Sequence, residues 1–251
     1  MPGLPINRIR RLWPHAIQSI RTIALWLLES IAPSCCLLCR QKPEYRHGLC
    51  RNCWMTLPAN KDHCERCALP MGQTGLCGCC QQRSPAFDSV IAPMCYQPPI
   101  DQILRALKYR QHLSFARTVA GLISDAVACA GAPRPDLLLG TPMTPHALRK
   151  RGFNQAAFVA HLIGRDLGIP VSASVLKKTR ESERQSVLGA KERQINLKGA
   201  FHCTRLLQGK HIALIDDILT TGATANEASR MLKDAGAARV DIWVCARTGK
   251  C

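Results

Sequence analysis

Eight cysteines in the first third of the chain have a spacing that suits metal binding. They form four Cys-x2-Cys pairs, and a two-residue spacer allows both thiolates of a pair to face one tetrahedral ion. The short apolar run of the first residues disfavours a secretion signal, and therefore disulfides, so we expect closed four-thiolate zinc centres that are structural rather than catalytic. The pairs are Cys36 with Cys39, Cys50 with Cys53, Cys64 with Cys67, and Cys77 with Cys80.

The spacing leaves three points about these centres open. An iron–sulfur centre is the alternative to zinc, because four thiolates also hold such clusters. Cys35 and Cys79 each adjoin a proposed ligand and could replace it. The pairs could combine in chain order or interleave. In each case the metal replaces a missing apolar core, so metal loss is expected to unfold residues 35–84 and leave the following domain folded.

A second stretch, residues 212–224, has the composition of a sugar-phosphate site. An apolar run ends at two carboxylates, and a turn rich in threonine and glycine follows. Free amides at a helix start, threonine hydroxyls and a glycine form a nest for a phosphate monoester. The carboxylates repel phosphate, so they must serve sugar hydroxyls or a divalent cation beside it. The predicted site comprises Asp216, Asp217, Thr220, Thr221, Gly222, Ala223 and Thr224.

The elements that must position this loop are indicated by helical and strand patterns that alternate from about residue 87 onward. Such alternation favours an α/β fold in which helices flank a parallel sheet. Apolar spacing predicts two helices within residues 103–127, and further helices at Phe153–Leu167 and Thr224–Ala235. Strands are predicted at Asp136–Thr141, Val171–Leu176, His211–Ile215 and Arg239–Ala246.

Composition and the first residues limit the cellular setting. A hydrophobic fraction of 47% is enough for a core, and a formal net charge of +17 favours polyanionic or phosphorylated partners. Residues 1–34 have an amphipathic helical pattern, and their longest apolar run, Ile23–Leu28, is too short to span a bilayer. We expect a cytoplasmic protein without a transmembrane segment, whose first helix packs on its own domain or touches a membrane surface or partner helix.

Two motifs resemble a known family. Residues 212–224 resemble the phosphoribosyl-pyrophosphate loop of the type I phosphoribosyltransferases, in which an acidic pair precedes a TTGxT turn. The run from Arg149 to Gln155, behind N-terminal Cys knuckles, is similar to the ComF family of competence-associated phosphoribosyltransferase-like proteins. The resemblance extends from Pro33 to Arg247. It implies a type I phosphoribosyltransferase-like sheet at 85–251 that follows a zinc-binding module at 35–84.

The resemblance also implies roles for individual residues. Asp216 and Asp217 would be the catalytic pair that meets the ribose hydroxyls, and residues 220–224 would hold the 5-phosphate. Arg149, Lys150 and Arg151 would contact the pyrophosphate, with magnesium as the accompanying cation. Basic residues of the segment around 177–193 would form either a mobile flap over the ligand or an ordinary solvated loop.

Three functions are compatible with these roles. The first is a ComF-type protein that binds phosphoribosyl pyrophosphate and handles incoming single-stranded DNA in natural transformation or DNA utilisation. The second is an active phosphoribosyltransferase of nucleotide metabolism, a glycosyltransferase that transfers pentosyl groups. The third is a non-catalytic adaptor that senses the ligand and docks a helicase-like competence protein. The sequence names no acceptor, so it leaves turnover undecided.

Overall fold

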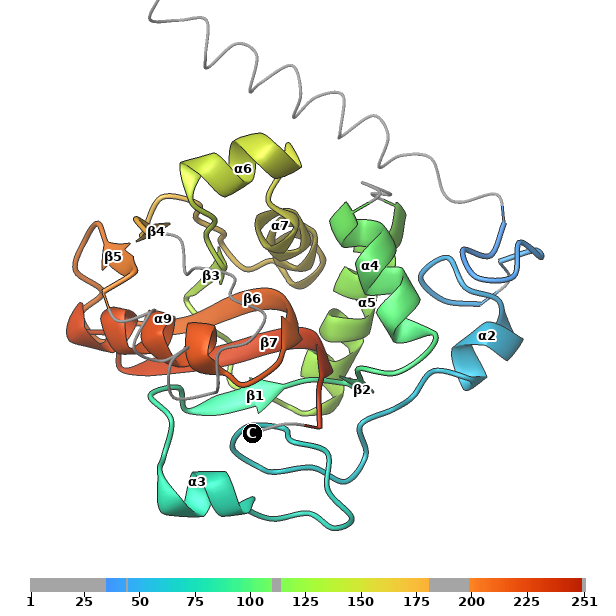
Figure 1. Ribbon diagram of the computed structural model, residues 1–251, viewed down its shortest axis with the longest axis horizontal. Coiled ribbons are helices and arrows are strands. Elements are labelled where there is room, and N and C mark those ends of the chain that lie inside the picture. Colours follow the sequence, from blue (N-terminus) through green and yellow to red (C-terminus); the bar gives the residue numbers. More distant parts are fainter. Residues whose placement is uncertain (1–34, 44, 110–113, 181–198, 250–251) are drawn as a thin grey trace, which may run out of the picture.

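The computed structural model describes residues 35–249, apart from 44, 110–113 and 181–198, so the helix expected within residues 1–34 lies outside the described residues. A parallel sheet crosses the middle of the molecule (Figure 1). Its strand order is β1-β7-β6-β3, and β2 also pairs with β7. The elements are α2 (Arg51–Met55), α3 (Gly78–Gln82), β1 (Ser89–Ile91), β2 (Met94–Cys95), α4 (Ile100–Tyr109), α5 (Ser114–Cys129), β3 (Leu137–Gly140), α6 (Pro145–Arg151), α7 (Gln155–Leu167), β4 (Leu176–Lys178), β5 (Phe201–Cys203), β6 (His211–Leu219), α9 (Ala223–Asp234) and β7 (Arg239–Arg247).

Helices cover both faces of this sheet, as the sequence pattern predicted. Side chains alternate along β6, so that Ala213 and Ile215 pack with α4, α5 and α7, whereas Ile212 and Leu214 pack with α9. Trp243 of β7 is fully buried in the first of these layers. A central strand that is buried on both faces is expected to be rich in apolar residues, and β6 and β7 each contain an unbroken apolar run, Ile212–Ile215 and Ile242–Ala246. The predicted parallel α/β fold is confirmed.

One predicted strand is wrong. Residues 171–176 were expected to be extended throughout, but Val171 makes only a single bridge to Leu138, and β4 begins at Leu176. The Ser172 hydroxyl lies 3.2 Å from the Ser174 hydroxyl and accepts the Ser174 amide at 3.3 Å. Such side-chain bonds compete with a strand ladder and turn the chain. β4 then pairs with β5 in a separate antiparallel ribbon.

A second difference concerns β6, which is longer than predicted. The predicted strand ended at Ile215, whereas the observed strand continues to Leu219 and pairs with β7 from His211 to Leu219, with Asp217 as the one residue outside the register. Asp216 and Asp217 therefore lie within the strand rather than after it. Carboxylates are unusual in a central parallel strand, and such local exceptions are typical of functional sites.

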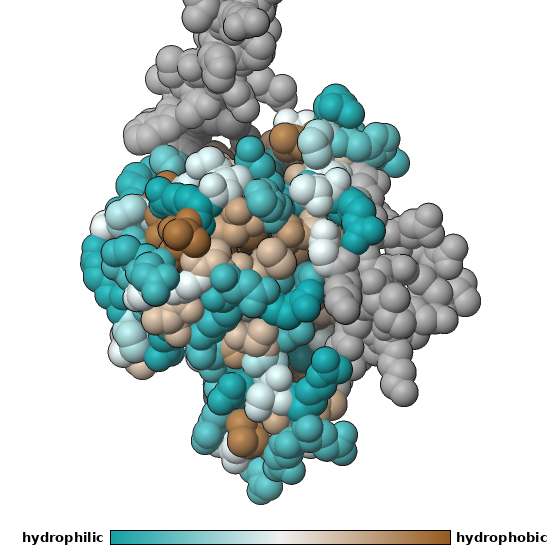
Figure 2. Space-filling view, turned by 90° about the vertical axis from the view of Figure 1, so that its left-hand side faces the viewer, coloured by the Kyte–Doolittle hydropathy of each residue, from teal (hydrophilic) through white to brown (hydrophobic). Residues whose placement is uncertain are grey.

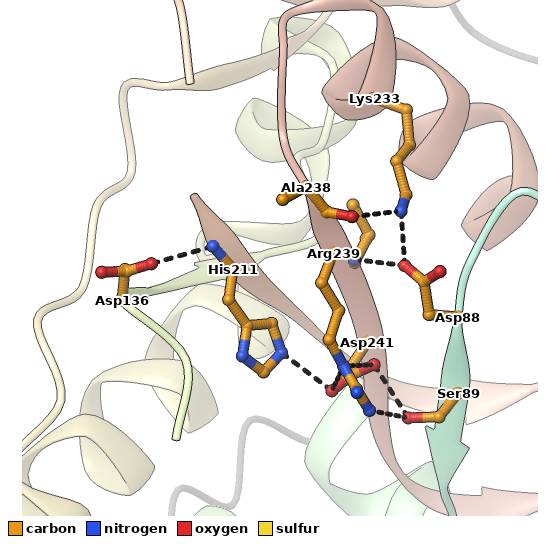
Figure 3. A network of polar contacts seen from close by, with 9 residues as sticks. Asp88, Ser89, Asp136, His211, Lys233, Ala238, Arg239 and Asp241 are labelled. Atoms are coloured by element: carbon orange, nitrogen blue, oxygen red, sulfur yellow. Dashed lines mark hydrogen bonds and ion pairs between the residues drawn. The ribbon is translucent and has the colours of Figure 1, made fainter. Parts of the chain in front are cut away.

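The opposite, N-terminal end of the sheet is joined by a polar network (Figure 3). Asp241 of β7 is fully buried, and its carboxylate accepts from the Ser89 hydroxyl at 2.8 Å and from Arg239 Nε at 3.0 Å. Its second oxygen lies 2.8 Å from His211 Nε2 of β6. The network thus ties β1, β6 and β7 together, and it leaves the other ends of these strands available for a ligand.

The face that bears β5 and α9 is largely hydrophilic, with small scattered apolar areas (Figure 2). Over the residues that the structure describes, the helices lack the combination of length and apolar character that crossing a bilayer requires.

Candidate functional site

The predicted phosphate loop joins the end of β6 to the start of α9. Gly222 caps the helix with φ 75°, and it has no side chain with which to satisfy the first helical amides. Thr221 Oγ1 accepts the Ala223 amide only at 3.4 Å. Thr220 is exposed, and Thr221 and Thr224 are half-buried. Unsatisfied amides and the positive end of the helix dipole make this turn suited to an anion.

The two carboxylates lie side by side just before this turn. Asp216 Oδ1 accepts the Asp217 amide at 2.8 Å, and Asp217 Oδ1 accepts the Ile218 amide at 3.0 Å. Burial, and then the neighbouring charge of Asp217, raise the pKa of Asp216 to about 7. A cation or a set of sugar hydroxyls would stabilise the ionised pair, so the arrangement suits the predicted ligand chemistry.

A third charged residue, Lys108, belongs to this site and was missed by the sequence analysis. Its Nζ lies 3.8 Å from Asp217 Oδ2, a buried oxygen that accepts no hydrogen bond from the described residues. Lys108 lies near the end of α4, more than a hundred residues before the acids. The sequence offered one sign of its role, a lysine in an amphipathic helix whose apolar residues Ile103, Leu104 and Leu107 are buried.

The turn after β3 lies beside the strand that carries the acid pair. Gly140 pairs with Ile215 across the parallel ladder, and Thr141 donates both its amide, at 2.9 Å, and its hydroxyl, at 3.1 Å, to the Ile215 carbonyl. A side chain on Gly140 would come within 2.4 Å of Ala157 in α7, so only glycine allows this close packing. The carboxyl ends of β3 and β6 therefore meet at one edge of the sheet.

The three basic residues predicted to bind pyrophosphate form the last turn of α6. Arg149 and Lys150 are exposed, and Gly152 ends the helix with φ 85°. Arg151 lies partly buried, with Nη1 3.9 Å from Met143 Sδ. α6 begins at Pro145, five residues after the end of β3. Their contact with a pyrophosphate stays a prediction.

The eight predicted cysteine ligands gather into two groups, and the pairs combine in chain order. Within each group the sulfurs lie within 4.8 Å of one another. Two of the spacings, 3.6 Å between Cys39 and Cys50 and 3.7 Å between Cys67 and Cys77, match the ~3.8 Å that four sulfurs would keep around zinc. Cys35 and Cys79 belong to neither group. The first centre is Cys36, Cys39, Cys50 and Cys53, and the second is Cys64, Cys67, Cys77 and Cys80.

Backbone amides stabilise the thiolate form of one cysteine in each centre. Burial opposes ionisation of Cys36, but amides of neighbouring residues outweigh it and lower the pKa of this thiol to about 6. The pKa of Cys64 is lowered to about 6 for the same reasons, and the Cys77 amide donates to its sulfur at 3.3 Å. Amide bonds to sulfur are typical of four-thiolate centres, so the residues present fit zinc.

Comparison with known proteins agrees with both parts of this description. Residues 27–81 match the family model of a double zinc ribbon domain, and residues 146–251 match that of a phosphoribosyl transferase domain. The DNA utilization protein YhgH of Salmonella typhi is 32% identical, over 86% of this chain and 98% of that protein. Competence protein F of Haemophilus influenzae is 28% identical over 84% of this chain and 96% of its own. Competence protein ComFC of Bacillus subtilis is 27% identical over 82% of this chain and 86% of its own. The chain therefore belongs to the ComF family, in which a double zinc ribbon precedes a phosphoribosyltransferase-like domain.

Proposed function

We propose that this protein binds phosphoribosyl pyrophosphate with magnesium at the β6–α9 loop, as part of DNA utilisation or DNA uptake. Ligand binding is supported by one observation: the acidic pair lies at the end of β6 that leads into the start of α9, which Gly222 caps. The loop amides and threonine hydroxyls would hold the 5-phosphate, and Asp216 and Asp217 would hold the ribose hydroxyls. The magnesium would shield the charge of the pyrophosphate.

The DNA part of the proposal is supported by the relatives and by charge. Two of the relatives carry the names DNA utilization protein and competence protein. The chain has 34 lysines and arginines against 17 acidic residues, a surplus that suits contact with a nucleic acid backbone. We therefore assign the protein a cytoplasmic role with single-stranded DNA as a partner, and a helicase-like competence protein as a further candidate partner.

An active phosphoribosyltransferase is the second candidate, and the match of residues 146–251 to a transferase domain favours it. In such a reaction an acceptor attacks the anomeric carbon as pyrophosphate leaves, and positive charge builds on the sugar. Asp216 and Asp217 would orient the ribose, while the basic residues of α6 would stabilise the leaving pyrophosphate. No covalent nucleophile on the protein is required.

Isothermal calorimetry with phosphoribosyl pyrophosphate and magnesium tests the proposal. Wild-type protein should bind one ligand per chain, and the variant Asp216→Asn with Asp217→Asn should bind at least about tenfold more weakly, the equivalent of one lost hydrogen bond to a charged group. Asp136→Asn, at the opposite end of the sheet, is the matched control. Unchanged affinity in the double variant, with its circular dichroism intact, would remove the ribose assignment.

The same samples separate binding from turnover. Pyrophosphate release with candidate acceptors would establish the transferase. Ligand binding without release for any acceptor would favour a ligand-sensing role.

A further inference from the structure

Arg247, the last residue of β7, is a buried arginine that touches the phosphate loop. Only 3% of its surface is exposed. Its Nη1 lies 3.2 Å from the Leu219 carbonyl oxygen and donates to the Thr220 carbonyl as well. It also lies 2.7 Å from the Thr248 carbonyl oxygen. One guanidinium therefore gathers carbonyl groups from the ends of β6 and β7 at the point where the loop begins.

These contacts fix the direction of the loop amides. In a trans peptide the carbonyl and the following N–H point in opposite directions. When Arg247 holds the carbonyls of Leu219 and Thr220, the amides of Thr220 and Thr221 must point away from the guanidinium. The proposed anion nest needs these amides to converge on a phosphate, so the arginine preorganises the loop without contacting the ligand.

The other side of the guanidinium reaches the second cysteine centre. Arg247 Nε donates to the Cys67 carbonyl at 3.1 Å, and the neighbouring sulfurs of Cys67, Cys77 and Cys80 act electrostatically on the guanidinium. The cysteines of this centre also share one core cluster with Leu219 and Ala223 of the loop. A four-thiolate zinc centre carries a charge of about −2, which would offset the buried positive charge.

The first cysteine centre is attached elsewhere. His47 Nε2 lies 3.0 Å from Asp125 Oδ2 of α5, and the Thr118 hydroxyl donates to the His47 carbonyl at 2.6 Å. Trp54 packs on the core layer of α4, α5 and α7. In Figure 1, α2 of the first centre lies beside α4 and α5, whereas α3 of the second lies below the sheet next to β1. The two centres thus differ in their contacts: the second reaches the phosphate loop through Arg247, and the first contacts α5.

We propose that the second cysteine centre, when it holds its metal, sets the conformation of the phosphate loop through Arg247, and that the first centre does not. Arg247 is then a positioning residue. The inference deepens the proposed function and rests on it for the identity of the ligand. It makes the zinc ribbon a part of the sugar-phosphate site rather than a separate module.

Two substitutions in the metal-loaded full-length protein test this inference by hydrogen exchange and ligand binding. Arg247→Lys keeps the charge but loses the planar fork that spans several carbonyls. Arg239→Lys alters an arginine at the other end of the same strand and is the matched control. Arg247→Lys should speed exchange in peptides covering 216–224 by about tenfold or more, as expected for the loss of a charge-assisted hydrogen bond. It should weaken binding of phosphoribosyl pyrophosphate with magnesium to a similar extent.

A comparison of the two centres completes the test. Cys64→Ser should speed hydrogen exchange in the same loop peptides, whereas Cys36→Ser should speed hydrogen exchange in peptides of α5. Arg247→Lys protein that is folded and has unchanged loop exchange and ligand affinity would overturn the inference, as would equal loop effects from the two cysteine variants. If wild-type protein fails to bind the ligand, the proposed function fails, and loop exchange alone still decides whether the second centre controls the loop.

Discussion

At the scale of single residues, the ionisation of Asp216 should govern how well the proposed magnesium complex binds. Its pKa of about 7 exceeds the ordinary value of about 3.9, because burial and the neighbouring Asp217 disfavour the charged form. Affinity for phosphoribosyl pyrophosphate with magnesium should therefore rise between pH 6 and pH 8, as the carboxyl loses its proton. Calorimetry at pH 6, 7 and 8 measures this rise. Asp216→Asn should bind more weakly and change less with pH, and a flat wild-type profile would contradict the assignment.

Lys108 provides a second prediction at this scale. Removing it leaves the buried Asp217 oxygen without its nearby cation. Lys108→Met should lower the free energy of unfolding by about 1–3 kcal/mol at pH 8, the usual cost of leaving a buried polar atom without a partner. Lys108→Arg, which keeps the charge, should lose less. Urea denaturation measures both, and adding Asp217→Asn to Lys108→Met should recover most of the loss. An equal loss in the double variant would show that the two side chains do not interact.

Residues that are contiguous in the sequence could be predicted, and residues that meet only in the fold could not. Asp216, Asp217 and the loop to Thr224 form one short stretch, so their types and order already indicated a sugar phosphate. Lys108 and Arg247 come from other elements, and only the packing of α4 and the end of β7 brings them to that stretch.

At the scale of elements, the start of α9 depends on a glycine. Gly222 has φ 75°, a conformation in which a β-carbon is strained. Gly222→Ala should lower the free energy of unfolding by about 1–3 kcal/mol and should weaken ligand binding, since the helical amides would shift. Gly72→Ala is the control, because a β-carbon there meets no atom within 4 Å and the backbone is not in the left-handed region. Equal, small effects of the two changes, measured by thermal denaturation and calorimetry, would contradict a special role for this turn.

Patterns of apolar residues predicted most of the large elements but not their ends. The helices α5, α7 and α9 and the strands β3, β6 and β7 lie where periodicity placed them. Short elements such as β1, β2 and α6 gave no clear period. The second half of β6 was not predicted, because charged residues usually follow the end of a buried strand. The strand predicted at 171–176 was wrong, because Ser172 and Ser174 turn the chain there.

At the scale of the whole molecule, the sequence suggested a zinc module that would unfold without disturbing the rest. The structure instead places the second cysteine centre in the core cluster that contains β6 and α9. We therefore expect metal loss at that centre to affect the α/β domain. Composition could not reveal this, because the cysteines and the sheet residues they contact lie far apart in the chain.

The net charge of +17 leads to a prediction for the whole molecule as well. If the protein contacts single-stranded DNA through the backbone, affinity should fall steeply between about 50 mM and 200 mM salt, since bound counterions are released. Fluorescence anisotropy with a labelled oligonucleotide measures this dependence, with duplex DNA of the same length as the comparison. Binding that is independent of salt would contradict backbone contact.

A crystal structure with phosphoribosyl pyrophosphate and magnesium tests the central claim most directly. We predict that the 5-phosphate lies on the amides and hydroxyls of residues 220–224, with the ribose hydroxyls against Asp216 and Asp217. A ligand bound elsewhere, or this turn found closed by side chains at saturating ligand, would contradict the account.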